Sequence, residues 1–574
     1  MGYVPPMNQE WQIRTPDRHQ VERIQRILGC SPVTATVLAN RGIDGEDGII
    51  RYMNLSLADL RPPFAIKDMD AAVRRIAQAI ENRERVLIFG DYDVDGITAV
   101  TLLLEFFRCV GLDADYYIPH RCDEGYDLQV DHVFGVALPR EADLIITVDC
   151  GSSRHEAVRS AKESGIDVII TDHHTITSPP KAAAVVNPRR TDCTAGFDHL
   201  AGVGVAFVLV VCLRKHLREK GFWQSGSEPN LKHFLDLVAL GTIADMVPLV
   251  GDNRILSKIG MEVINAGRRP GLTALLKAAG VKEAVRNTDD IAFRLAPRLN
   301  AAGRLDHAKT AVELLTTRDP QRAEEIAESL NQLNRRRQET EKRILEKALA
   351  LVGDDPEKTG RNALVLTHPE WHEGVLGIVA SKLTNRFFRP TILISSRNGI
   401  GKGSGRSIPG INLYEGLDAC SVHLEKFGGH PMAAGLQIRP DRIDAFRNDF
   451  EAWASKAVGR EPPTKTIDID CELNFHEVTE TMIDELEKLL PFGEGNPEPL
   501  FLAREVRVSS SMIVAKHHRR MSLRQGNPSA RAMNAIQFNV DRGRMTDAFD
   551  QVAFRLRWNR WKGRKTAQII IEET

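Results

Sequence analysis

The chain has 574 residues and a formal net charge of −1, with 42% hydrophobic and 27% charged residues, as expected of a globular protein. No apolar run is long enough to span a membrane, and the first residues, MGYVPPMNQEWQIR, contain no apolar core. The eight cysteines form no CxxC pair, which excludes the usual zinc and disulfide patterns. We therefore expect a cytoplasmic protein with reduced thiols and no membrane contact.

The charge is unevenly distributed along the chain. Residues 503–574 contain 15 Lys/Arg and 6 Asp/Glu, a balance of +9 that leaves −10 for the rest of the chain. A basic module at the end of an acidic body favours contact with a polyanion such as a nucleic acid. Chance unevenness is the alternative explanation.

The N-terminal part, to about residue 65, has helical patterns. From about residue 70 to 250, short apolar runs alternate with helical patterns, which predicts a parallel sheet with crossover helices. Residues 85–90 (RVLIFG) are expected to form a buried strand, and residues 97–110 the helix that follows it. Two further strands are expected in ADLIITVDCG and IDVIITDHH.

Acidic residues follow the first expected strand in the motif GDYDVDG. Asp91, Asp93 and Asp95 resemble the opening of an EF-hand calcium loop. An EF-hand needs a bidentate glutamate at loop position 12, and counting from Asp91 this position holds Leu102, so a calcium loop is excluded. The three carboxylates instead lie where ligands bind in open α/β sheets, at the carboxyl end of a strand.

Side chains with metal-binding chemistry end all three strands, and a further aspartate follows the helical segment FLDLVALGTIADMVPL. The proposed ligands are Asp93, Asp95, Asp149, His173 and Asp245. Four carboxylates and one imidazole suit Mn²⁺ or Mg²⁺ better than zinc. Two such ions would activate a water for phosphoryl displacement. His174 could donate to a phosphate oxygen, and Asp172 could orient a neighbouring histidine. For any one aspartate, a turn or helix cap is the simpler interpretation.

Residues 320–352 are predicted to form one long helix, because apolar residues recur at spacings of three and four at both of its ends. The middle of the helix, LNRRRQETEK, is polar. We expect an interdomain strut that docks a domain at each end and crosses solvent between them. A surface helix with a basic face is the alternative.

A second α/β segment covers residues 360–457 and carries several candidate anion-binding groups. Ser404 and Arg406, in GKGSGR, could hold a phosphate, although the glycines could simply form tight turns. The motif GGH, residues 428–430, places His430 at an exposed turn with Gly428 and Gly429 beside it. Upstream, FRLAPRLNAAGRL contains a cluster that suits phosphates or, alternatively, a solvated basic face: Arg294, Arg298, Asn300 and Arg304.

The last segment, residues 466–574, has short strand-like runs and many arginines, so we expect a β-barrel of OB type. Such a barrel would hold a single strand by phosphate charge and base stacking. Trp558 and Trp561, among arginines, are candidate stacking residues. Core packing is the alternative for either tryptophan.

In this order, GDYDVDG, VDCG, TDHH and GTIADMVPL resemble the DHH phosphoesterase superfamily. The later motifs FRLAPRLNAAGR, LNRRRQETE, HEGVLGIVASKL, SGRSI and FGGHPMAAG resemble its RecJ branch, and PFGEGNPEP fits the start of that branch's OB domain. The resemblance covers roughly residues 65–500. It implies an exonuclease that degrades single-stranded DNA from 5′ to 3′ in repair and recombination, with a helicase and a single-strand-binding protein as plausible partners. Nothing demands more than a monomer.

The resemblance also implies a domain order and residue roles. The expected domains are a helical lead-in (1–65), a DHH catalytic domain (66–318), a connecting helix (319–355), a DHHA1 domain (356–460) and an OB domain (461–574). Asp149 would bridge two metal ions, with His174, Asp172 and Asp91 as catalytic groups. The 5′ end would be held by Arg304, Ser404 and Arg406, with His430 and His372 facing the same groove.

One stretch departs from the family pattern. In HRCDEGYDL, Arg121 would contact phosphate, but Asp127 stands where a glycine is expected, so the local turn is open to question. Two rival functions remain. A phosphodiesterase of the same superfamily would act on dinucleotides or short oligoribonucleotides, and a non-catalytic DNA-binding scaffold would have lost ligands. All five predicted ligand positions are filled, which argues against the scaffold.

Overall fold

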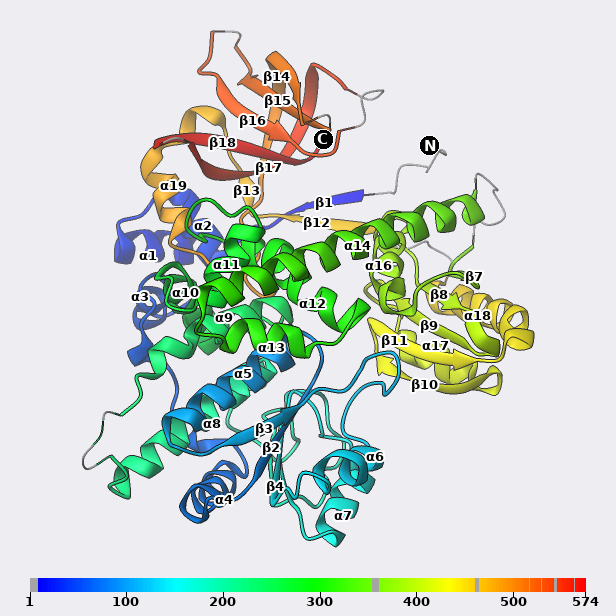
Figure 1. The fold of residues 1–574 in the computed structure, drawn as a ribbon. Helices are drawn as coiled ribbons and strands as arrows, with labels where there is room; N and C mark the ends of the chain where they lie inside the picture. Colours follow the sequence, from blue (N-terminus) through cyan, green and yellow to red (C-terminus); the bar gives the residue numbers. More distant parts are fainter. Residues whose placement is uncertain are drawn as a thin grey trace.

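The computed structural model describes residues 9–223, 226, 228–353, 361–459, 464–515, 517–527, 529–540, 545–561 and 563–574. The side chains of Gln9, Asn398 and Trp561 lie outside this description. The described chain forms a parallel-sheet domain, a long helix, a second α/β domain and a C-terminal barrel (Figure 1). No described helix is both long and apolar enough to cross a membrane.

The first domain is built on a five-stranded parallel sheet of order β3-β2-β4-β5-β6. Its strands are β2 (Val86–Gly90), β3 (Ala114–Tyr117), β4 (Leu144–Val148), β5 (Asp167–Thr171) and β6 (Ala184–Val186). Successive side chains of a strand face opposite sides of the sheet, so Val86 and Ile88 pack on one side and Leu87 and Phe89 on the other. The predicted strands at 85–90, ADLIITV and IDVIIT are confirmed.

Helices cover both faces of this sheet and extend the domain toward the strut. Helices α4, α5 and α8 share the larger core, and α6 and α7 pack on the other face. The helices are α4 (Met69–Asn82), α5 (Val94–Cys109), α6 (Val130–His132), α7 (His155–Glu163), α8 (Gly202–Glu219), α9 (Leu235–Ala244), α10 (Gly251–Asn265), α11 (Pro270–Ala278), α12 (Ala296–Leu305) and α13 (Lys309–Thr316). Two π-helical turns, Val133–Ala137 and Asp290–Leu295, precede α7 and α12.

The long helix α14 (Pro320–Val352) spans the predicted residues and links the two α/β domains (Figure 1). The expectation that its polar middle crosses solvent is wrong for one face of the helix, although Arg335, Arg336, Gln338 and Glu339 on the other face are exposed. Asn334, Arg337 and Glu341 are buried, and Arg337 donates to the other two. Lys382 of the second domain also pairs with Glu341. The buried face of this polar middle therefore lies in an interdomain contact, because its ionic groups satisfy one another there.

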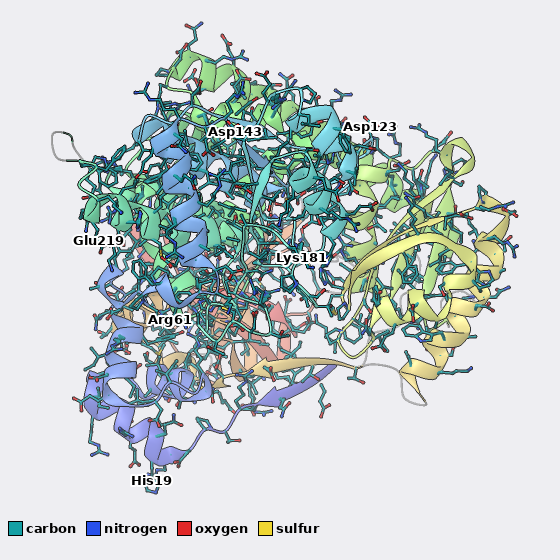
Figure 2. All side chains as sticks on the ribbon, turned by 90° about the horizontal axis from the view of Figure 1, so that it is seen from below. His19, Arg61, Asp123, Asp143, Lys181 and Glu219 are labelled. Carbon is teal, nitrogen blue, oxygen red and sulfur yellow. The ribbon has the colours of Figure 1, made fainter. Side chains whose placement is uncertain are left out.

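The second domain has a mixed five-stranded sheet of order β10-β11-β9-β8-β7, in which only β7 and β8 are parallel. The strands are β7 (Leu364–His368), β8 (Thr391–Ser395), β9 (Gly401–Arg406), β10 (Leu424–His430) and β11 (Ala433–Ile438). The helices are α16 (Leu376–Phe387), α17 (Leu413–Ala419) and α18 (Ile443–Val458). Figure 2 shows this domain beside the parallel-sheet domain, with Asp123 at the boundary between them.

The C-terminal domain is a closed barrel, as predicted. Its strands pair in the order β14-β15-β16-β18-β17, and β17 returns to β14. They are β14 (Phe501–Val514), β15 (His518–Gln525), β16 (Met533–Gln537), β17 (Ala548–Trp561) and β18 (Arg564–Glu573). A short strand β13 (Cys471–Glu472) and helix α19 (Glu480–Glu487) precede the barrel.

The N-terminal segment packs against this barrel, although the two are far apart in the sequence. Strand β1 (Gln9–Ile13) pairs in parallel with β12 (Lys465–Ile469), ahead of the barrel. Helices α1 (Arg18–Leu28), α2 (Pro32–Asn40) and α3 (Glu46–Met53) share one hydrophobic core with α19 and the barrel strands. The predicted helical character of this segment is confirmed, but its partner was not foreseen.

Candidate active site

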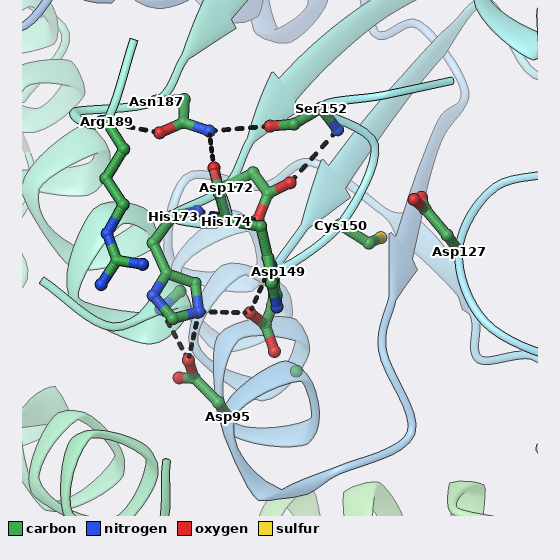
Figure 3. Close-up of polar contacts among 12 residues, drawn as sticks. Asp95, Asp127, Asp149, Cys150, Ser152, Asp172, His173, His174, Asn187 and Arg189 are labelled. Atoms are coloured by element: carbon green, nitrogen blue, oxygen red, sulfur yellow. Dashed lines mark hydrogen bonds and ion pairs between the residues drawn. The ribbon is translucent and has the colours of Figure 1, made fainter. Parts of the chain in front are cut away.

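Three strand ends deliver the acidic and histidine side chains to one edge of the parallel sheet (Figure 3). Asp91 follows β2, Asp149 follows β4, and Asp172, His173 and His174 follow β5. A fourth segment contributes from outside the sheet, because Asp245 directly follows α9. The predicted convergence is therefore present, and it arises because the strands are parallel and end together.

The expectation that Asp93 and Asp95 both lie on a turn is wrong, because α5 begins at Val94 rather than at Ile97. Asp93 caps the helix, and its carboxylate accepts from the backbone N–H groups of Asp95 and Gly96. Asp95 is thus in the first helical turn. Its two carboxylate oxygens accept from Gly202 N–H at 2.6 Å and Val203 N–H at 2.8 Å, at the start of α8.

The donor atoms lie close enough to hold metal ions. His173 Nε2 lies 3.1 Å from Asp149 Oδ1, 3.6 Å from Asp245 Oδ2 and 3.8 Å from Asp95 Oδ2. Three groups place their donor atoms within 4.8 Å of one another: Asp91, Asp93 and Asp149; Asp95, His173 and Asp245; and Asp149, His173 and His174. Asp149 belongs to two groups, as a bridging ligand would. Asp91, predicted as catalytic, lies among the metal donors.

The electrostatics of these groups fit bound cations. Burial, and then the charges of neighbouring carboxylates, raise the pKa of Asp91, Asp149 and Asp245, and raise that of Asp95 to about 7. Buried Asp91 Oδ1, Asp149 Oδ1 and both ring nitrogens of His173 have no hydrogen-bond partner in the described structure. A cation would satisfy these donor atoms and offset the repulsion. Mn²⁺ or Mg²⁺ fits this oxygen-rich set.

His174 is oriented by the aspartate two residues before it. Its Nδ1 lies 2.8 Å from Asp172 Oδ1, and Asp172 also accepts from the backbone N–H groups of His173, His174 and Ser152. Burial lowers the pKa of His174, but the Asp172 carboxylate outweighs burial and raises it to about 9. Asp172 therefore holds the imidazole through Nδ1 and favours its protonated form, and His174 lines the cleft.

A cavity of about 1360 Å³ separates the two α/β domains beside this site. Its walls include His174 and Asp172 from the first domain and Gly428, Gly429 and His430 from the second. The His430 ring lies nearly parallel to that of His174, with centroids 6.2 Å apart. His430 of the GGH motif therefore faces His174 across the cleft.

Three arginines and a serine gather in this cavity without a carboxylate partner in the described structure. Arg304 donates to Gly374 O, Arg406 donates to Gly405 O and lies 3.4 Å from Ser404 Oγ, and the Arg121 guanidinium lies over the Tyr92 ring. Burial, and then neighbouring arginines, lower the pKa of Arg304 and Arg406. An anion between them would relieve this repulsion.

The glycines of GKGSGR form a strand rather than tight turns. On β9, Gly403 and Gly405 face the domain core, where an added Cβ would lie 2.9 Å from Leu436 and Leu413 respectively. Lys402, Ser404 and Arg406 alternate with them and line the cavity. The glycines are needed for packing, and this packing sends the polar side chains to the cleft.

Four predicted substrate residues do not line this cavity. Arg294 donates to Asp290, Ala279 O and Gly280 O, and Arg298 donates to Asn331 and Arg294 O. Asn300 is not among the lining residues, and His372 lines an adjoining cavity of about 240 Å³. Their positions give the predicted substrate contacts no support.

Sequence reasoning missed several groups around the site. Tyr126 places its hydroxyl 3.2 Å from Asp149 O and against the His174 ring. Lys402 donates to Cys122 O from across the cleft. The amides of Gly202 and Val203 come from GVGVAF, where an added Cβ at Gly202 would lie 2.6 Å from Asp149. Only the repeated glycines of that motif gave a signal.

Several arginines of the barrel are engaged in ion pairs. Arg555 and Arg557 both pair with buried Glu498, Arg557 also with Asp289 of the first domain, and Arg560 with Glu487. Trp558 is buried in the shared core and donates to Asp484, so it is not available for base stacking. The side chain of Trp561 lies outside the described residues. The predicted stacking role of Trp558 is therefore wrong.

Three family models match separate parts of the chain. Residues 85–242 match the DHH family, N-terminal domain; residues 360–456 match the DHHA1 domain; and residues 469–573 match the RecJ OB domain. The first range contains every predicted metal donor except Asp245. The second contains Ser404, Arg406 and His430.

Known proteins resemble the chain over nearly its whole length. The single-stranded-DNA-specific exonuclease RecJ of Dickeya dadantii is 40% identical over 87% of this chain and 89% of its own. RecJ of Salmonella typhimurium is 35% identical over 99% of each chain. Among solved structures, RecJ of Thermus thermophilus in complex with Mn²⁺ has a TM-score of 0.84 at 31% identity, covering 99% of this chain and 79% of that one. A structure of the same protein with Mg²⁺ has a TM-score of 0.78 at 29% identity and covers 99% and 78%.

Proposed function

The chain belongs to the RecJ family of DHH proteins, and from this premise we propose that it removes 5′-mononucleotides from the 5′ end of single-stranded DNA. Its relatives are named single-stranded-DNA-specific exonucleases, and this chain is such an exonuclease with Mn²⁺ or Mg²⁺ as cofactor. The alternatives of a dinucleotide phosphodiesterase and of a non-catalytic scaffold are not favoured.

One observation carries the proposal. A single cleft brings the acidic and histidine donors together with arginines that pair with no carboxylate among the described residues. Phosphodiester cleavage needs cations at the scissile phosphate, and exonuclease action needs a grip on the strand end. We assign Arg121, Arg304, Ser404 and Arg406 to the terminal 5′ phosphate, which would set the polarity.

The residues of the chain divide the chemistry as follows. Asp91, Asp93, Asp95, Asp149, His173 and Asp245 would hold two cations, with Asp149 shared between them. When bound, such a pair activates a water and stabilises the leaving oxygen of the phosphodiester. His174, held by Asp172, would donate from Nε2 to a phosphate oxygen. His430 would contact the strand from the opposite wall.

The domain limits given above, the monomeric state and the partners belong to the same proposal. One copy of the chain contains all the donor groups and both walls of the cleft, which supports a monomer. A helicase that unwinds a duplex and a single-strand-binding protein would supply the substrate during repair and recombination. Such an enzyme would act where chromosomal DNA lies, in the cytoplasm.

The proposal is tested with one oligonucleotide labelled at its 5′ or its 3′ end. With Mn²⁺, the 5′ label should appear at once as mononucleotide, and the 3′ label as a shrinking ladder. The blunt duplex and the EDTA reaction should show no cleavage. Release of the 3′ label as mononucleotide would overturn the polarity, and hydrolysis of dinucleotides without cleavage of long strands would move the enzyme to the small-substrate group.

A further inference from the structure

The loop between β3 and α6 carries two side chains into the cleft. Arg121 lies over the Tyr92 ring at 4.6 Å, the Tyr92 and Tyr126 rings meet edge to face at 6.2 Å, and Tyr126 meets His174 edge to face at 5.9 Å. These contacts form a continuous series from the phosphate-binding arginine to the catalytic histidine. A shift of Tyr126 would therefore disturb both ends of the series.

The residue that sets the direction of this loop is Asp127. Its φ is 76°, a left-handed conformation that disfavours residues with a Cβ, and glycine is the residue expected there. The Asp127 side chain is also 6% exposed. Burial of the carboxylate and the left-handed backbone each cost free energy, so other interactions of the fold must offset both costs.

Arg154, elsewhere in the same domain, offsets the cost of burying the Asp127 carboxylate. It lies immediately before α7, and its Nε donates to Asp127 Oδ2 at 2.7 Å. Asp127 Oδ1 accepts from Leu128 N–H at 2.8 Å, so both oxygens are engaged. Arg154 also lines the large cavity. The ion pair thus joins the loop that carries Arg121 and Tyr126 to the edge of the sheet that carries the catalytic groups.

We propose that Asp127 and Arg154 are a positioning pair that stabilises a left-handed turn and holds Tyr126 and Arg121 in register with His174. The pair acts through the loop and does not touch the substrate. The inference rests on the proposed function, because it concerns the grip on the 5′ phosphate. It predicts that Arg154 matters only because Asp127 is charged and buried.

The test is a rescue experiment on the full chain with Mn²⁺, in which a change at Asp127 should restore what Arg154→Ala loses. In Arg154→Ala the Asp127 carboxylate is left buried and unpaired, and KM for a 5′-phosphorylated oligonucleotide should rise about tenfold relative to the 5′-hydroxyl form. In the double variant Asp127→Gly with Arg154→Ala, the turn needs no partner, and KM should return to within about threefold of wild type. Asp127→Asn with Arg154→Ala should behave similarly, because asparagine tolerates positive φ and carries no charge.

The matched control is Arg159→Ala, an exposed arginine on α7 with no partner in the described structure. It should leave the phosphate preference unchanged. A double variant as impaired as Arg154→Ala, or an Arg154→Ala protein with wild-type phosphate preference, would overturn the pair. If Arg154→Ala does not fold, the pair still predicts that both double variants fold and bind the phosphorylated strand. Dissociation constants measured on the same oligonucleotides separate this failure from that of the proposed function, which is tested on the wild-type protein by the substrate and polarity of its cleavage.

Discussion

The cleft and the barrel both contain clustered arginines, but the two clusters are in opposite electrostatic states. Among the described residues, Arg304 and Arg406 in the cleft have only hydroxyl and carbonyl acceptors, and their pKa is lowered by burial and by neighbouring arginines. Arg557 and Arg560 in the barrel have carboxylate partners; burial lowers the pKa of Arg557, but its bonds to Glu498 outweigh this and raise it.

The difference shows which charges are available for a ligand. In the described part of the protein, Arg121, Arg304 and Arg406 pair with no carboxylate, and the clustered acidic donors pair with no lysine or arginine. A metal ion or a phosphate would therefore gain a strong charge interaction there. Arg555, Arg557 and Arg560 of the barrel are instead paired with Glu498 or Glu487, and Arg557 also joins the barrel to the first domain through Asp289. A basic composition alone does not distinguish these two uses.

The largest effect is expected at the acidic end of the cleft. Asp149→Ala removes the carboxylate common to two donor groups, and cleavage should fall on the order of a thousandfold or more because charge stabilisation at the phosphate is lost. Binding of a single strand, measured by fluorescence anisotropy, should largely survive. Residual cleavage near the wild-type rate in a nuclease-free preparation would contradict the shared role. Asp441→Ala, an exposed acid paired with Arg439, is the control.

Metal removal should abolish cleavage and lower the stability of the folded protein. EDTA should abolish cleavage, and Mn²⁺ at about 100 times its Kd should stabilise the folded protein by about 2.7 kcal/mol, seen as a rise in melting temperature. Without metal, Asp95 has its pKa raised from 3.8 to about 7, so the folded state binds more protons between these values. The metal-free protein should then lose stability as pH rises from about 4 to 7. If the stability of the metal-free protein increased over this pH range, the raised pKa of the clustered carboxylates would be contradicted.

Arg406→Ala tests the arginines of the cleft. Loss of a charge-assisted hydrogen bond costs about 1.5–3 kcal/mol, so the advantage of a 5′-phosphorylated end should fall about 10- to 100-fold. The readout is the ratio of kcat/KM for phosphorylated and unphosphorylated strands. Equal losses on both substrates would mean that Arg406 does not recognise the terminal phosphate. Arg442→Ala, on the exposed surface of the same domain, should leave the ratio unchanged.

The smallest effects are expected in the barrel, where one arginine should affect stability and another should affect DNA binding. Arg557→Ala leaves buried Glu498 with one partner fewer and should cost about 2 kcal/mol of stability, with little change in the salt dependence of DNA binding. Arg520 on β15 is exposed and has no partner in the described structure. Arg520→Ala should leave the melting temperature unchanged and reduce the salt slope by about 0.7 if it contacts one phosphate. The reverse pattern would break the comparison between the two regions.

The catalytic edge could be predicted from sequence because its geometry is local. An aspartate that follows an apolar run lies at the carboxyl end of a strand, and parallel strands bring Asp91, Asp149 and His173 together. The partners of charged residues could not be predicted in this way. Trp558 and Arg557 are held by Asp484 and Glu498, some 60 to 75 residues earlier in the chain, and sequence patterns do not show such pairs. For the same reason the sequence does not show that one face of the middle of α14 is buried, where Lys382 pairs with Glu341.

The pairing of β1 with β12 has a consequence for how the chain is made. Residues 9–13 are made well before their partner strand at 465–469 and before the barrel that completes the core of α1–α3. At about 5–20 residues per second, the N-terminal helices wait roughly half a minute or more with an apolar face exposed. The catalytic domain can fold during this interval. The core shared by α1–α3 and the barrel should therefore be completed only after the barrel strands have been made, when the early helices meet their late partners.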